Sequence, residues 1–216
     1  MYTKRTQLHQ HFQEYATIYI FMIILFLTGI VFGAIIVNSM SFMQKQDLFF
    51  YLERFFGQIT ADQQVEGKSI FISSFFYHIR YLLLLCLLGL SVIGLPLVWI
   101  LLFLKGLVVG FSVGFIVNQL GGQGLLLASL AIAPQNLVII PVYIIGGSLS
   151  MIFSLTLLGK LFSRKISQPI IRPFTKYMIA FSCLMIVTIV ASFIEAFIAN
   201  GAMQALIKTY FSYTIL

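Results

Sequence analysis

The side chains that could do chemistry in this chain are few and far apart in the sequence. Glu195 is the one acidic residue inside a long apolar stretch near the C-terminus, and an intramembrane carboxylate can serve a proton or ion path. Its place about four residues from the end of that stretch favours a second interpretation, in which it reaches water or pairs with Arg80. His9, His11 and His78 are scattered and lack the spacing of metal ligands.

Motifs of common catalytic sites are absent from the sequence. There is no GxxxxGK[ST] loop, no HExxH and no pair of carboxylates inside the apolar stretches. Cys86 and Cys183 lie within apolar stretches without a CxxC spacing, so we expect them to pack as small inert side chains. We therefore expect no catalysis by this chain alone, and neither a metal ion nor a cofactor.

Membrane helices are the elements that must position these residues. Of the 216 residues, 60% are hydrophobic and 9% are charged, and the mean hydropathy is +1.03. This composition leaves too little polar surface for a soluble globule. A helix needs about 20 apolar residues to cross roughly 30 Å of hydrocarbon. Long apolar stretches occur near residues 17–37, 81–117, 124–158 and 177–199. We therefore expect one all-α polytopic membrane domain over residues 1–216.

The stretch 81–117 is long enough for two crossings, so it must turn. A turn at Lys105-Gly106 is favoured because a cation can snorkel to an interface, and Pro96 then only kinks a helix. The resulting prediction is a bundle of about five spans with one long loop. These spans are 17–37, 81–104, 106–120, 124–158 and 177–199, and the loop is 38–79. In an alternative, residues 106–140 form two re-entrant half-helices.

Basic residues predict the orientation of the spans. With the N-terminus inside, the inner segments carry most of the cations, which agrees with the preference of short basic loops for the cytoplasm. These cations are Lys4, Arg5, Lys105, Lys160, Arg164, Lys165, Arg172 and Lys176. We expect a cytoplasmic N-terminus and an extracytoplasmic C-terminus. Membrane lipid is the expected partner of the basic loop, and nucleic acid is not.

The extracytoplasmic loop 38–79 contains an amphipathic helical pattern. Leu48 and Leu52 fall on one face together with further apolar residues, and charged residues fall on the opposite face. Such a helix can lie on the membrane surface or pack on the bundle, and it can also dock a partner. The candidate partner contacts are Phe49, Glu53, Arg54 and Phe56.

Two further motifs concern helix packing and helix breaks. Small residues at a spacing of four let helix backbones approach closely, either within the chain, in a homodimer or against a partner helix. They are Gly29 and Gly33 in the first span, and Gly106, Gly110 and Gly114 in the third. Pro134 and Pro141 predict a kinked or broken helix with Gln135 and Asn136 at mid-depth. These amides can lock the bundle, or they can bind a solute as in transporters.

Three segments together resemble the stage II sporulation protein M family. They are FLKGLVVGF at 103–111, the glycine-rich turn at 118–124, and APQNLVIIP at 133–141, and the resemblance covers nearly the whole chain. Many relatives outside spore formers carry Pro-His-Gly and then a Glu before the second proline, where this chain has Pro134-Gln135-Asn136 and Ile139. That departure removes a polar pair, so a His/Glu-dependent activity is not expected here. The Pro-Gln-Asn version resembles the endospore-forming branch.

The resemblance implies a role for the chain. It implies an integral protein of the mother-cell membrane of a Gram-positive spore former, at the septal and engulfing membrane. There it would act during forespore engulfment with two peptidoglycan-degrading partners, as a non-catalytic scaffold that recruits or anchors them. A transporter or permease-like subunit that uses the helix around Pro134–Pro141 is the alternative function.

Overall fold

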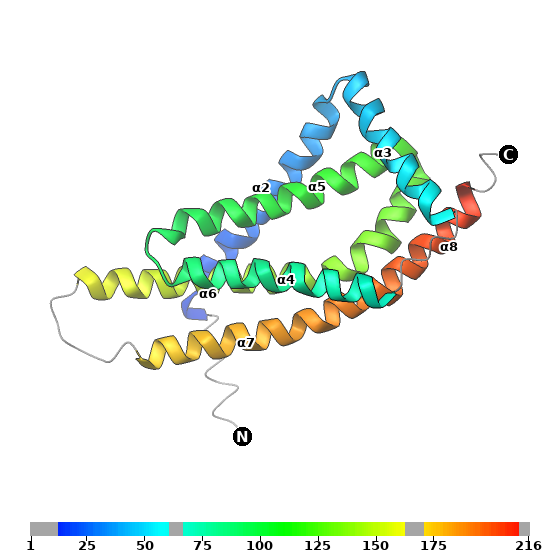
Figure 1. Ribbon diagram of the computed structural model, residues 1–216. Helices are drawn as coiled ribbons and strands as arrows, with labels where there is room; N and C mark the ends of the chain where they lie inside the picture. The colour runs from blue at the N-terminus through cyan, green and yellow to red at the C-terminus, as the bar shows by residue number, and fades with distance from the viewer. Residues whose placement is uncertain (1–12, 61–66, 163–170, 212–216) are drawn as a thin grey trace.

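The computed structural model describes residues 13–60, 67–162 and 171–211, and in these ranges the chain forms helices and no strand (Figure 1). The α-helices are α2 (Ala16–Ser39), α3 (Phe42–Thr60), α4 (Gly67–Gly89), α5 (Gly94–Leu127), α6 (Ala133–Phe162), α7 (Ile171–Phe193) and α8 (Asn200–Phe211). Two short π-helices, η1 (Ala128–Ile132) and η2 (Ile194–Ala199), interrupt the long helical runs. The predicted all-α polytopic membrane architecture is confirmed.

Five of the described helices form the spans of the bundle. Those long and apolar enough to span a membrane lie within Ala16–Ser39, Gly67–Gly89, Gly94–Leu161 and Ile171–Ala205. The third of these stretches has 68 residues, which is two crossings rather than one. It turns back at Gly121, whose φ of 57° is a conformation that glycine adopts without steric cost (Figure 1). The spans are therefore α2, α4, α5, α6 and α7.

The turn between the second and third spans lies at residues 90–93, so its predicted position at Lys105-Gly106 is wrong. Backbone hydrogen bonds from Leu90 and Ser91 to the preceding residues close α4, and α5 begins at Gly94. Pro96 therefore lies in the first turn of α5, where a missing N–H costs nothing. The predicted boundaries of spans 81–104 and 106–120 and of loop 38–79 move with it. The re-entrant alternative for 106–140 is also wrong, because α5 runs unbroken through Lys105.

Hydroxyl groups bind α4, α6 and α7 together. Ser150 on α6 donates a hydrogen bond of 2.8 Å to the carbonyl of Leu85 on α4. Tyr177 on α7 donates one of 2.8 Å to the carbonyl of Cys86, also on α4. In a bilayer such bonds between helices stabilise association without help from water. Contacts between His78 and Tyr143 and between Gly89 and Ser154 continue in the same direction, so α4 is parallel to α6. The contact between Ser74 and Ser192 shows that α4 is antiparallel to α7.

Glycines bring α2 and α5 into backbone contact, and these helices share the most extensive interface among the described elements. A Cβ at Gly29 would overlap the carbonyl oxygen of Phe103, and a Cβ at Gly110 would overlap that of Ile30. Gly33 and Gly106 are equally tight against the facing backbone, whereas Gly114 is in ordinary contact with Ala34. The glycine ridges thus serve helix packing inside one chain, with α2 parallel to α5.

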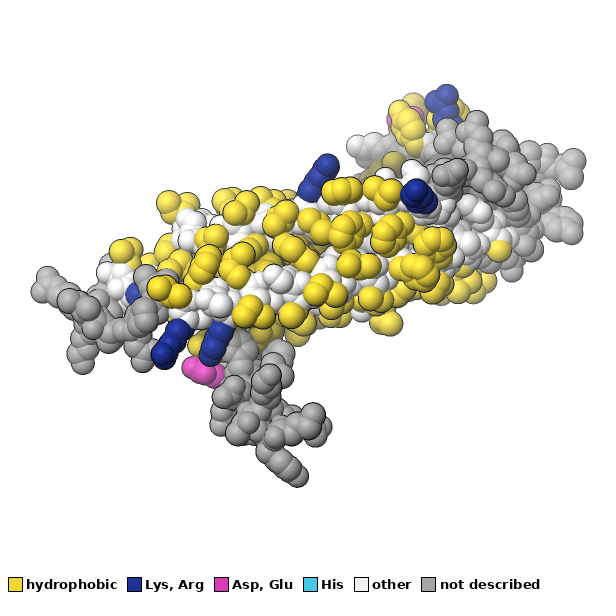
Figure 2. Space-filling view, turned by 60° about the horizontal axis from the view of Figure 1, so that its bottom comes forward, with side chains coloured by type: hydrophobic (Ala, Val, Ile, Leu, Met, Phe, Trp, Pro, Cys, Tyr) yellow, Lys and Arg dark blue, Asp and Glu magenta, His cyan; other side chains and the backbone are white. Residues whose placement is uncertain are grey.

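The outer surface of the bundle suits a hydrocarbon environment. Large apolar side chains of α2, such as Ile24, Val31 and Ile35, are more than half exposed. Figure 2 shows a broad band of hydrophobic side chains along one face of the bundle, with few charged ones among them. Exposed apolar area on this scale marks a surface that faces lipid rather than water.

Helix α3 is the amphipathic helix expected after the first span, and it closes one end of the bundle together with α8 (Figure 1). Its half-buried Leu52 packs with Leu127, Ala131 and Met203 around the bend that follows α5. The opposite face of α3, with Glu53, is exposed. One face of α3 therefore packs on the bundle and the other is exposed.

The α2–α5 contact generates a prediction with a built-in control on the same helix. Gly110→Ala should destabilise the purified protein by about 1–3 kcal/mol, because its new methyl group must push α2 away. Gly114→Ala, one turn further along, should change stability by less than about 0.5 kcal/mol. Thermal unfolding in lipid nanodiscs measures both. Equal stability of the two variants would contradict the close α2–α5 approach.

Candidate functional site

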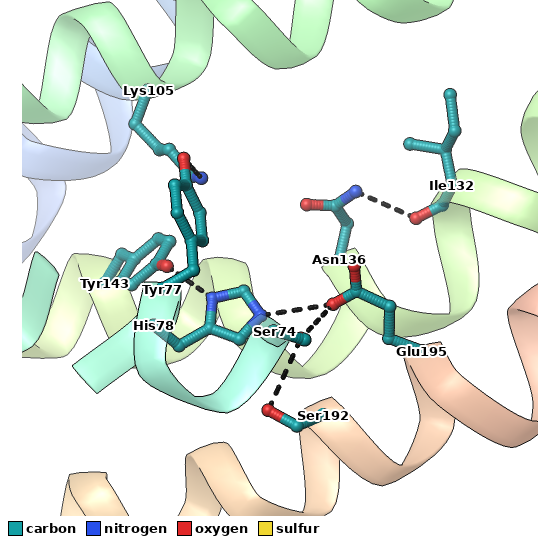
Figure 3. A network of polar contacts seen from close by, with 9 residues as sticks. All are labelled: Ser74, Tyr77, His78, Lys105, Ile132, Asn136, Tyr143, Ser192 and Glu195. Carbon is teal, nitrogen blue, oxygen red and sulfur yellow. Dashed lines mark hydrogen bonds and ion pairs between the residues drawn. The ribbon is translucent and has the colours of Figure 1, made fainter. Parts of the chain in front are cut away.

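A group of polar side chains, from the fully buried Tyr143 to the exposed Tyr77, lies where α4, α5, α6 and η2 meet (Figure 3). We call this group the polar cluster. Its members are Ser74, Tyr77 and His78 of α4, Lys105 of α5, Gln135, Asn136 and Tyr143 of α6, Ser192 of α7 and Glu195 of η2.

Glu195 is the acceptor on which the polar cluster converges. The hydroxyl of Ser74 donates a short hydrogen bond to Oε2 of Glu195, and Nε2 of His78 lies 3.4 Å from the same oxygen. With its amide nitrogen turned toward the carboxylate, Gln135 donates at 3.0 Å to Oε2 and at 3.2 Å to Oε1. Three donors from α4 and α6 thus hold a carboxylate that is still 29% exposed.

His78 links Glu195 to a buried tyrosine. The histidine is 5% exposed, and its Nδ1 lies 2.6 Å from the hydroxyl of the fully buried Tyr143. A neutral imidazole satisfies both neighbours if Nε2–H donates to Glu195 and Nδ1 accepts from Tyr143. The row Tyr143, His78 and Glu195 is therefore a continuous hydrogen-bonded chain across α6, α4 and η2.

Lys105 is stabilised by tyrosines rather than by a carboxylate. Its ammonium donates a hydrogen bond of 3.0 Å to the hydroxyl of Tyr77. It also lies 4.6 Å from the ring centre of Tyr77, 5.1 Å from that of Tyr143 and 5.7 Å from that of Tyr81. Cation–π attraction of this kind is strongest where water is scarce. These rings explain why a lysine that we placed at an interface lies inside a helix.

The polar cluster surrounds a cavity of about 230 Å³. Lys105, His78, Gln135, Asn136 and Glu195 all contribute to its lining. A second, apolar cavity of about 450 Å³ lies between α5 and the bend into α6, and it adjoins the first because Val109, Ile132 and Asn136 line both.

Two ionisable members of the polar cluster lie near the middle of their helices. His78 is the twelfth residue of α4 and Lys105 is the twelfth residue of α5. At 1.5 Å per residue each side chain is about 17 Å from the start of its helix, which is close to half of a hydrocarbon core of roughly 30 Å. Ionisable residues at such a depth mark a functional site by default, because burying them without partners is costly.

The helix carrying the APQNLVIIP motif is continuous where a break was expected. The backbone is helical through Pro134 and Pro141, and the break in the chain lies instead at Gly121. The π-helix η1 ends just before Pro134, where a wider turn accommodates a ring that clashes in an α-helix. Asn136 donates a hydrogen bond of 2.8 Å to the carbonyl of Ile132, while the neighbouring Gln135 faces Glu195.

The polar cluster contains some of the residues that the sequence singled out and leaves others outside it. Glu195 pairs with His78 and not with Arg80, which is exposed. The expected loop 38–79 contains His78, so the predicted spans give it no helical neighbours, although its spacing of four from Ser74 puts both on one face of α4. The motif itself lacks the His/Glu pair of some relatives, yet a histidine and a glutamate from other helices lie beside it.

The remaining candidates lie away from this site. Phe49 is half-buried on α3, and Glu53 and Arg54 are exposed there. The side chain of Phe56 falls outside the described residues. Within the described ranges, no group of three His, Cys, Asp or Glu side chains could hold a metal ion.

The fold and the polar cluster define a polytopic helical membrane protein with ionisable groups near the middle of α4 and α5. The sequence model of the family described as stage II sporulation protein M matches residues 22–200. The chain therefore belongs to the stage II sporulation protein M family, and it is a membrane protein involved in sporulation. Neither curated proteins nor solved structures gave a match to the chain.

The hydrogen bonds of Glu195 lead to a prediction about stability. Ser74→Ala should destabilise the protein by about 1–3 kcal/mol, because it removes a buried donor to a charged acceptor. The neighbouring Ser73 is exposed, so Ser73→Ala should change stability by less than about 0.5 kcal/mol. Thermal unfolding of both purified variants is the measurement. Two unaffected variants would show that the Ser74–Glu195 contact contributes nothing to stability.

Proposed function

We propose that this protein is a non-catalytic scaffold that holds peptidoglycan-degrading partners at the septal membrane during forespore engulfment. Membership of the stage II sporulation protein M family supports this role through what the resemblance implies. The structural observation that carries the proposal is the position of α3 at one end of the bundle. One face of α3 packs on the bundle and the other is exposed. The bundle would fix the position, and α3 would offer the surface.

The free face of α3 has the composition of a partner-binding surface. Phe50 and Tyr51 are 61% and 66% exposed, and Glu53 and Arg54 lie directly beyond them. Exposed aromatic residues beside arginine are enriched where proteins bind one another. In this arrangement the aromatic side chains would supply buried area, and the charged pair would select the partner.

The orientation of the bundle supports the same proposal. The parallel contact of α2 with α5 places the start of α2 at the end of the bundle that holds the 90–93 turn. Helix α6 ends and α7 begins at this end as well (Figure 1). In the sequence two cations precede α2 and five lie between residues 160 and 176, and short basic segments stay cytoplasmic. The end with α3 would then face the cell wall on which the partners act.

Cysteine labelling tests this orientation. In a chain with Cys86 and Cys183 replaced by Ala, Ser91→Cys should react with a membrane-impermeant maleimide only after permeabilisation. Gln123→Cys, exposed beside the Gly121 bend, should react in intact cells. Labelling of both positions from the same side would contradict the five-span arrangement, and the reverse pattern would contradict the proposed orientation.

Affinity purification from sporulating cells tests the scaffold role itself. We expect the tagged chain to recover peptidoglycan-degrading proteins, identified by mass spectrometry, above an unrelated five-span membrane protein. The double variant Glu53→Lys/Arg54→Glu should lose this recovery and delocalise the hydrolases, because it reverses both charges while keeping the net charge. If purification of the tagged wild-type chain recovers no hydrolases, the scaffold proposal is overturned.

A matched control uses the same helix about two turns earlier. Lys45→Glu/Asp47→Lys also reverses two charges of α3 without changing its net charge, and it should leave hydrolase recovery intact. Equal loss in both double variants would show that any disturbance of α3 suffices. Unchanged hydrolase localisation in the Glu53/Arg54 variant would exclude this surface.

A further inference from the structure

We propose that the cavity of the polar cluster binds a small zwitterion of the α-amino acid type. The carboxylate of the ligand would face Lys105, and its ammonium group would face Glu195. This inference is independent of the scaffold role, which uses the exposed face of α3.

The charges around the cavity carry this inference. Lys105 and Glu195 both line it, yet the two are not within ion-pair distance of each other. Figure 3 shows them on opposite sides of an open space, with Asn136 beside Glu195. Both side chains are half-buried, and opposite charges that are separated lose part of their hydration without gaining the full attraction of a contact pair. A dipolar ligand between them would supply a contact for each charge.

Both charged groups have hydrogen-bonding capacity left for a ligand. The ammonium of Lys105 has three N–H donors, of which one is used by the hydroxyl of Tyr77. At Glu195 the donors Ser74 and His78 both bind Oε2, whereas Gln135 reaches both oxygens. Oε1 therefore retains room to accept a hydrogen bond from an ammonium group.

The balance of charge selects the class of ligand. With the neutral tautomer of His78 that satisfies both of its neighbours, Lys105 and Glu195 give the cavity wall one positive and one negative charge. A ligand with a single charge would leave one wall charge unpaired and add its own cost of desolvation. A zwitterion brings no net charge and matches both walls, and the amides of Gln135 and Asn136 can orient it.

The size of the cavity sets an upper limit on that ligand. Its volume of about 230 Å³ corresponds to roughly seven or eight waters at about 30 Å³ each. This is too large for a single bare ion and below the roughly 300–1,000 Å³ typical of pockets for larger ligands. Glycine and L-alanine are therefore suitable probes.

The first test measures the unfolding temperature of the full chain in lipid nanodiscs with L-alanine and with two analogues that each lack one of its charged groups. Alanine and glycine should raise the unfolding temperature. Propionate, which lacks the amine, and ethylamine, which lacks the carboxylate, should each bind at least about tenfold more weakly. This comparison needs no variant, so it does not depend on whether substituted chains fold. Absence of stabilisation by both amino acids would overturn the proposal, as would equal stabilisation by either analogue.

The second test assigns the two ends of the ligand. Lys105→Met and Glu195→Gln should each weaken binding of radiolabelled alanine by about tenfold or more. The controls Lys176→Met and Glu14→Gln remove the same charges from exposed positions and should bind alanine as the wild type does. Unchanged binding in folded Lys105 and Glu195 variants would overturn the site. Loss of alanine binding with intact hydrolase recovery would separate this site from the scaffold function.

Discussion

A charged side chain inside a bundle of membrane helices must find its partners within the protein, and the arrangement of α4, α5, α6 and η2 follows from this constraint. Lys105 and Glu195 are the two such charges of the polar cluster. Three tyrosine rings from α4 and α6 surround the lysine, and donors from the same two helices hold the glutamate. Each charge therefore needs α4 and α6 side by side. The hydroxyl-to-carbonyl bonds between these two helices keep them so.

Helix α5 combines two requirements on adjacent residues. Gly106 and Gly110 face α2 and allow its backbone to approach, while Lys105 and Val109 line the polar cavity. Small residues on one face and a cation on the other divide the helix into a packing side and a functional side. The α2–α5 pair thereby forms a firm wall for the cavity. Without the glycines, α5 could not lie close to α2 and still present Lys105 to the tyrosines of α4 and α6.

Hydropathy and residue spacing predict much of this fold, because apolar stretches, close glycine spacings and the amphipathic α3 are local properties of the chain. The position of the turn after the second span is different. A lysine in an apolar stretch indicates an interface when only its neighbours in sequence are considered. Here its partners come from α4 and α6, and Tyr143 is 38 residues away. The polar cluster brings together residues from 74 to 195, so no local pattern reveals it. The second span predicted with a turn at Lys105 begins at residue 81, so it does not include His78.

The two π-helices lie beside the polar cavity. η1 lies between the α3 end of the bundle and the polar cavity: Ala131 packs in the group that holds Leu52 of α3, and the next residue, Ile132, lines the cavity. η2 carries Glu195. A π-turn inserts one extra residue into a helix and so redirects the side chains that follow it, at a cost in hydrogen-bond geometry. That cost is tolerated here because η1 admits Pro134 and η2 presents the carboxylate to three donors at once. The surface of α3 and the interior cavity are thus separate sites that share one structural element.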